Sequence, residues 1–141
     1  MPKYTSILAN GYHEKIRSLK ELKDAYHRTM GFFLDGKAIG SGDLNPMPRE
    51  KGSVHTEAVG LDKPFRKKGH GLPMYLHLIR TAKRIGAKRI YSSYRLNEHS
   101  RRMWSEKLAK LFDVKTHYAA KRCRRCGCNS RKPRRYSITL R

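Results

Sequence analysis

The turn Arg66–Gly71 has the residue types and spacing of a phosphate-binding site, since it reads Arg-Lys-Lys-Gly-His-Gly. It follows an extended pattern over Ser53–Leu61 and opens a helical pattern over Leu72–Ile85. Backbone N–H groups at a helix start are unpaired, and the helix dipole adds positive potential there. Glycine lets a phosphate approach the backbone without a Cβ in the way. We therefore expect this turn to hold a pyrophosphate.

Two better-known phosphate motifs do not fit this turn. The dinucleotide fingerprint requires a third glycine, and a Walker A loop requires Gly-Lys followed by Ser or Thr. A plain basic turn at a helix start is the structural alternative. The residues that follow decide between them: a strand pattern over Lys88–Leu96, then Asn97, and then a second helical pattern over Ser100–Phe112.

This order resembles the core of the GNAT superfamily of N-acetyltransferases, which hold the pyrophosphate of acetyl-CoA in an Arg-x-x-Gly-x-Gly turn. The resemblance covers Ser53–Phe112, about 60 of 141 residues, and extends to the small members that bacteriophages encode. It implies a single α/β domain over residues 1–141, with a mixed, mostly antiparallel sheet flanked by helices. It also implies a set of residues that contact acetyl-CoA: Val59, Leu61, Arg66, Lys67, Lys68, Gly69, His70, Gly71, Asn97, Ser100 and Trp104.

Acetyl transfer to an amine requires a base, and His55 and Glu57 are the candidates. They lie eleven and nine residues before Arg66, the offsets at which family members with a base on this strand carry acids or histidines. The imidazole of histidine titrates near pH 6.5 without tuning, whereas a glutamate needs desolvation or a water relay. The alternative is that both are ordinary strand residues.

The leaving thiolate needs a proton, and the residue that the family often uses is missing. That residue is a Tyr seven positions after the Asn, where this chain has Trp104. We expect Trp104 to pack in the core or against CoA. The acid is then Tyr94, Tyr91 or Tyr118, or the thiolate leaves unassisted. Asn97 either contacts the CoA arm or simply caps the following helix.

The three cysteines of the chain lie together as Cys123, Cys126 and Cys128. Closely spaced thiols can bind zinc, but a fourth ligand is required, for which His117, a partner or water is a candidate. Thiols in the cytosol are normally reduced, so a structural disulfide is not expected. Reduced cysteines in a basic loop are the alternative.

Charge is the most unusual property of the composition. The net charge is +22, and residues 63–141 hold 24 Lys/Arg but only three acids. A one-sided basic surface is typical of proteins that bind polyanions, most often nucleic acid. Solubility is the alternative purpose of the charge. The densest cluster falls in a predicted hairpin loop over residues 121–135, and its nucleic-acid candidates are Arg122, Arg124, Arg125, Arg131, Lys132, Arg134 and Arg135.

The remaining pattern completes the predicted fold. We expect strands at Tyr4–Ala9, Val114–Ala120 and Tyr136–Leu140, a helix at Ser18–Met30 that stops at Gly31, and an Asp35-Gly36 hairpin. Ser41–Gly52 is expected to be a loop beside the acceptor site. No apolar run is long enough to span a membrane and no signal peptide is recognisable, so a cytoplasmic location is expected, in the host if the protein is viral.

The sequence therefore predicts an acetyl-CoA-dependent N-acetyltransferase that acts on a nucleic acid or on a protein bound to nucleic acid. The alternative is a non-catalytic, basic nucleic-acid-binding protein with the same fold and a hairpin that a metal stabilises. The missing acid at Trp104 favours the alternative, and the intact pyrophosphate turn opposes it.

Overall fold

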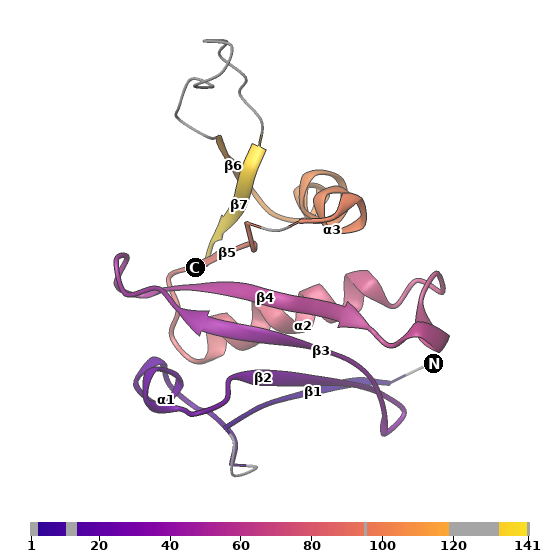
Figure 1. Cartoon of the computed structure of the whole chain (residues 1–141), viewed down its shortest axis with the longest axis horizontal. Coiled ribbons are helices and arrows are strands. Elements are labelled where there is room, and N and C mark those ends of the chain that lie inside the picture. The colour runs from indigo at the N-terminus through magenta and orange to yellow at the C-terminus, as the bar shows by residue number, and fades with distance from the viewer. Residues whose placement is uncertain (1–2, 11–13, 95, 119–132, 141) are drawn as a thin grey trace, which may run out of the picture.

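The computed structural model describes residues 3–10, 14–94, 96–118 and 133–140. They form one mixed sheet in the order β1-β2-β3-β4-β5-β7-β6, flanked by helices (Figure 1). Only β4 and β5 run parallel to each other. This confirms the predicted α/β domain with a mostly antiparallel sheet. The strands are β1 (Tyr4–Ala9), β2 (Thr29–Leu34), β3 (Lys37–Pro46), β4 (Ser53–Leu61), β5 (Arg89–Tyr91), β6 (Val114–Tyr118) and β7 (Pro133–Thr139).

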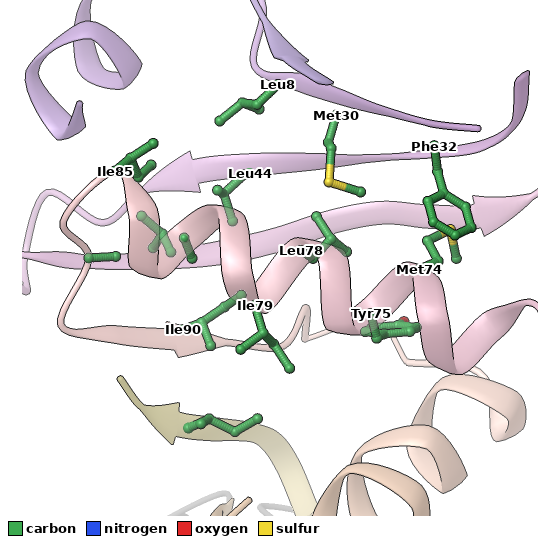
Figure 2. Packing of buried hydrophobic residues seen from close by; sticks show 14 of the residues in the cluster. Leu8, Met30, Phe32, Leu44, Met74, Tyr75, Leu78, Ile79, Ile85 and Ile90 are labelled. Carbon is green, nitrogen blue, oxygen red and sulfur yellow. The ribbon is translucent and has the colours of Figure 1, made fainter. Parts of the chain in front are cut away.

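Helix α2 (Gly71–Arg84) is the crossover between the two parallel strands, a connection that usually needs a helix. It lies along one face of the sheet and buries an apolar stripe there (Figure 2). The helix ends just before Gly86, whose φ of +99° suits the residue that follows a helix C-terminus. The buried residues of this core include Leu8, Met30, Phe32, Leu44, Met74, Leu78, Ile79 and Ile90.

Two shorter helical segments complete the layer of helices. Helix α1 (Leu19–Asp24) begins at Ser18, whose side chain accepts a hydrogen bond from the Glu21 N–H at 3.1 Å. Helix α3 (Glu98–Arg102) continues through a π-helical turn (Met103–Lys107) and a 3₁₀ turn (Leu108–Lys110). Such π-turns often occur near functional sites. Within the described ranges, no helix is long and apolar enough to cross a membrane.

The predicted helix over Ser18–Met30 is wrong beyond Asp24. The Arg28 guanidinium donates to the carbonyl oxygens of Leu22 and Lys23 at 2.6 and 2.9 Å, which satisfies the last turn of α1. The residues from Thr29 onward then pair with β1 and β3 as a strand. Tertiary pairing overrides the helical pattern here.

The predicted loop over Ser41–Gly52 is wrong in its first half, because β3 continues to Pro46. Gly42 lies within this strand. A Cβ at this position would lie 3.0 Å from Val59 Cγ2. Glycine at this position allows β3 to approach β4 closely. The predicted strand over Lys88–Leu96 is also too long, because β5 spans only Arg89–Tyr91.

Candidate active site

The parallel pairing of β4 and β5 lasts for only three residue pairs, of which the last joins His55 and Tyr91. Beyond it the Ser92 N–H donates to the Tyr136 carbonyl at 2.8 Å, so the chain after β5 turns toward β7 and away from β4. A cleft of about 320 Å³ opens beside this point. Its lining residues are Thr56, Glu57, Ala58, Val59, Tyr75, Ser93, Leu96, Asn97 and Ser100.

Strand β4 carries a β-bulge at the cleft. Ser41 pairs with Gly60 while Asp43 pairs with Glu57, so β4 has one residue more than β3 over this stretch. Ala58, one of the residues between them, adopts the left-handed conformation with φ of +50°. A bulge leaves backbone groups outside the ladder and bends the strand. Nothing in the sequence predicts this bulge, because an alanine carries no signal for a positive φ.

The turn Arg66–Gly71 fits a pyrophosphate. Arg66 Nε donates to the Leu61 carbonyl at 2.9 Å, so the turn is tied to the end of β4. Gly69 has φ of +83°, and no atom lies within 4 Å of the position that a Cβ would take. No side chain caps the N-terminus of α2, which leaves its first N–H groups for a ligand. The side chains of Arg66, Lys67 and Lys68 are exposed.

Two residues of the turn have roles that the sequence did not predict. A Cβ at Gly71 would lie 3.2 Å from Met103 Cε, so this glycine serves the packing of α2 against the π-helical turn. His70 Nδ1 lies 2.8 Å from the Tyr4 hydroxyl, which ties the turn to β1. The expectation that Gly71 also makes room for phosphate stays a prediction.

His55 and Glu57 point to the same side of β4, away from α2, because they alternate with the buried Val54 and Thr56. His55 Nδ1 lies 3.3 Å from Glu57 Oε1, a contact that becomes an ion pair only when the imidazole is protonated. The Ser93 hydroxyl donates to Glu57 Oε2 at 3.1 Å across the opening. Glu57 lines the cleft, and His55 lies next to it at the last pair of the parallel ladder. The structure therefore brings the two candidate bases together at the cleft.

The surroundings of His55 favour its neutral form. Burial lowers the pKa of the His55 imidazole below its usual range. The Glu57 carboxylate raises this pKa in part, and the Arg135 guanidinium lowers it. His55 is therefore neutral at pH 7 and able to accept a proton.

Trp104 is fully buried and its ring meets that of Tyr75 edge-on, with centroids 5.9 Å apart. This agrees with a core role, and Trp104 is not among the residues that line the cleft. Tyr75 does line it, and burial raises the pKa of its phenol, which Ser100 and Trp104 lower in part. A Tyr at a buried helix position carried no sequence signal for chemistry.

Of five other predicted residues, three line the cleft and two do not. Val59, Asn97 and Ser100 line the cleft, and Asn97 Oδ1 also caps α3 by accepting from the Ser100 N–H at 2.8 Å. Leu61 offers its carbonyl to Arg66. Tyr94, a predicted acid, is 51% exposed and packs its ring on the Arg135 guanidinium, 3.8 Å from the centroid.

The predicted hairpin loop falls mostly outside the described residues. This applies to Cys123, Cys126 and Cys128 and to Arg122, Arg124, Arg125, Arg131 and Lys132, and the side chain of Arg134 is likewise not described. Arg135 is only 5% exposed, so it is not part of an exposed basic cluster as predicted. His117, the suggested fourth zinc ligand, has Nε2 2.8 Å from the Ser137 hydroxyl. Within the described ranges, no three His, Cys, Asp or Glu side chains are grouped as a metal site.

Comparison with solved structures finds the same fold in acetyltransferases, two of them in complex with CoA. A Bacillus subtilis acetyltransferase in complex with CoA has a TM-score of 0.57 at 16% identity, over 81% of this chain and 77% of that one. Diaminobutyrate acetyltransferase from Paenibacillus lautus, in complex with its substrate and CoA, has a TM-score of 0.60 at 15% identity, over 99% and 96%. An N-acetyltransferase from Staphylococcus aureus has a TM-score of 0.53 at 20% identity, over 82% and 69%.

The sequence matches a family profile but no single curated protein. None of the curated proteins matches the chain. A profile of the acetyltransferase (GNAT) family matches residues 3–109, which is well over half of the sequence and includes the turn, the bulge and the cleft. The chain therefore belongs to the GNAT family and is an acetyl-CoA-dependent N-acetyltransferase.

Proposed function

We propose that this enzyme acetylates an amine of a nucleic acid or of a protein bound to nucleic acid, with Glu57 and His55 accepting the proton of the amine. The observation that carries the catalytic part is the contact of His55 with Glu57 at the cleft, where β4 and β5 part. Both side chains lie on the face away from α2. The acceptor then approaches from that face, while the CoA turn lies at the N-terminus of α2.

The charge of the chain supports the choice of acceptor. One pyrophosphate needs only a few cations, whereas the chain carries a net charge of +22. Many of the described Lys and Arg side chains are exposed. In the set given in the next sentence, only Arg102 forms an ion pair, with its Nε 3.3 Å from Glu98 Oε1. They include Arg80, Lys83, Arg84, Lys88, Arg101, Arg102, Lys107 and Lys110. Such a field attracts polyanions and concentrates them near the site.

Acetyl transfer requires one proton to leave the amine and one to reach the sulfur. Acetyl-CoA supplies an acetyl group on a thioester; the amine nitrogen bonds to its carbonyl carbon, and the carbon–sulfur bond breaks. Glu57 and His55 take the amine proton. The freed backbone of the bulge at Ala58 can stabilise charge on the carbonyl oxygen. Tyr75, held protonated by burial, can give a proton to the departing thiolate.

CoA should stabilise the folded protein, because a ligand that binds only the native state raises apparent stability. We expect millimolar CoA to raise the melting temperature, and Gly69→Asp to abolish this shift by placing a negative charge at the turn. Gly86→Asp is the matched control, since Gly86 also has a positive φ and open space but lies at the other end of α2. A melting temperature indifferent to CoA in the wild type would contradict the assigned turn.

Replacing the base should slow turnover without weakening CoA binding. We expect Glu57→Gln or His55→Gln to lower kcat by about 10²–10⁴-fold. Glu50→Gln is a control with an equally exposed carboxylate, 39% in each case, that pairs with Arg89 outside the cleft. The pKa of His55 is lowered, so the inflection of the pH–rate profile that reports its titration should lie below pH 6.5 in the wild type. This inflection should be absent from the profile of His55→Gln. Full activity in both variants would place the base elsewhere.

The proton donor can be identified by removing single hydroxyl groups. Tyr75→Phe keeps the ring that packs on Trp104 and should lower kcat by about 10²-fold or more. Tyr94→Phe keeps the ring under Arg135 and tests the donor suggested by the sequence. Loss of activity in Tyr94→Phe alone would return the role to Tyr94, and full activity in both would mean that the thiolate leaves unassisted.

The acceptor class can be tested through the salt dependence of binding to duplex DNA and RNA. Replacing Arg122, Arg124, Arg125 and Arg134 with Ala should flatten the log–log slope by about 0.9 for each lost phosphate contact on DNA. The control removes the same charge from exposed positions outside that set of cations, Lys15, Lys20, Lys23 and Lys51 to Ala, and should leave the slope nearly unchanged. If Cys123, Cys126 and Cys128 bind zinc, chelation should also weaken nucleic-acid binding. Affinity unchanged by the arginine replacements would overturn the role of this segment.

A further inference from the structure

Arg135 is a buried cation on the same face of the sheet as the candidate bases. His55 pairs with Tyr91 in β5, and Tyr91 pairs with Ser137 in β7. Directly paired residues share a face, as do residues two apart on one strand, so Arg135 lies on the face of His55 and Glu57. Strand β5 lies between β4 and β7 in the sheet (Figure 1).

Contacts with described residues fix the orientation of the Arg135 guanidinium and use only part of its N–H donors. Its Nε and Nη2 donate to the Ser92 carbonyl at 3.1 and 2.9 Å. Its central carbon lies 3.8 Å from the centroid of the Tyr94 ring and 5.0 Å from that of Tyr91. Among the described residues, Nη1 has no acceptor. A guanidinium presents five N–H donors in a fixed plane, so these contacts leave donors that suit an oxyanion.

No carboxylate side chain of the protein neutralises this buried charge. All eleven Asp and Glu residues belong to the described parts of the chain. The ion pairs found there join Arg89 to Glu50 and Arg102 to Glu98, Glu57 lies beside the neutral His55, and none of these contacts includes Arg135. A buried charge without a counter-ion is costly, and cation–π contacts and one carbonyl offset only part of that cost.

Arg135 is also close to the reacting groups. The carbonyl that it binds belongs to Ser92, and the next residue, Ser93, donates its hydroxyl to the Glu57 carboxylate. Its charge acts on the His55 imidazole. Tyr94, half-exposed, forms the outer wall of the guanidinium site. An amine that reaches Glu57 therefore brings its neighbouring substituents toward Arg135.

We propose that Arg135 binds an oxyanion that the acceptor carries near its amine. This inference rests on the proposed acetyl transfer but not on the nucleic-acid acceptor, because a phosphate and a carboxylate present the same chemistry to a guanidinium. The oxyanion accepts from the remaining N–H donors of the guanidinium, while the amine lies at Glu57 and His55.

The test compares amines that differ only in the oxyanion. Phosphoethanolamine is paired with ethanolamine, and 4-aminobutyrate with 4-aminobutanamide. We expect the wild type to prefer one charged member by about 10–100-fold in kcat/KM, the value of a hydrogen bond to a charged group. Preference for the phosphate or for the carboxylate identifies the source of the oxyanion. In Arg135→Met the preference should disappear, and Arg135→Lys should retain part of it.

Controls separate this site from a structural role of Arg135. Lys115→Met removes an exposed cation from the same face of β6 and should leave the preference intact. If none of the four amines is acetylated, calorimetric binding of inorganic phosphate and acetate to the CoA-saturated enzyme gives the answer. Wild-type binding that Arg135→Met abolishes, with CoA affinity retained, supports the proposal. Equal loss for charged and neutral amines, or no oxyanion binding, overturns it, whereas no thiol release with any acceptor refutes the transfer itself.

Discussion

The parting of β4 and β5 after His55 and Tyr91 is the constraint on which the whole site depends. A parallel pair requires a crossover helix, so α2 must connect the two strands and place the turn Arg66–Gly71 at its N-terminus. The bulge at Ala58 and the bond from Ser92 to β7 then separate the strands. Phosphate turn, cleft and candidate bases all follow from this one arrangement.

The small number of acidic residues affects the site as much as the large number of Lys and Arg residues does. Burial lowers the pKa values of His55, His77 and His117, and neighbouring cations, Arg135 for His55, Arg80 for His77 and Lys115 for His117, lower them too. The lowered pKa values favour the neutral form of these three imidazoles near pH 7. The same imbalance leaves Arg135 without a carboxylate partner. A positive field thus favours a neutral base and an anionic ligand together.

The sequence predicted β4 and α2 well, because alternation, the turn glycine and Gly86 all indicate the same boundaries. It failed where pairing partners decide the outcome. Thr29–Leu34 became a strand through β1 and β3. Strand β5 ended early because the Ser92 hydroxyl accepts from the Tyr136 N–H and the Arg135 side chain donates to the Ser92 carbonyl, which replaces the backbone ladder. The roles of Tyr75 and Arg135 depend on which face of an element they occupy and on which residues lie opposite. These tertiary neighbours cannot be read from a single sequence.

The central claim is that acetyl-CoA binds along the turn and the cleft between β4 and β5. Backbone amide NMR of the labelled protein during titration with CoA tests it most directly. Large shift changes are expected at Gly69, Gly71 and Leu72 and around Ala58, Ser93 and Ser100, while the amides of the turn at Asp35 and Gly36 should stay unchanged. Changes confined to other surfaces, or none at saturating CoA, would contradict it.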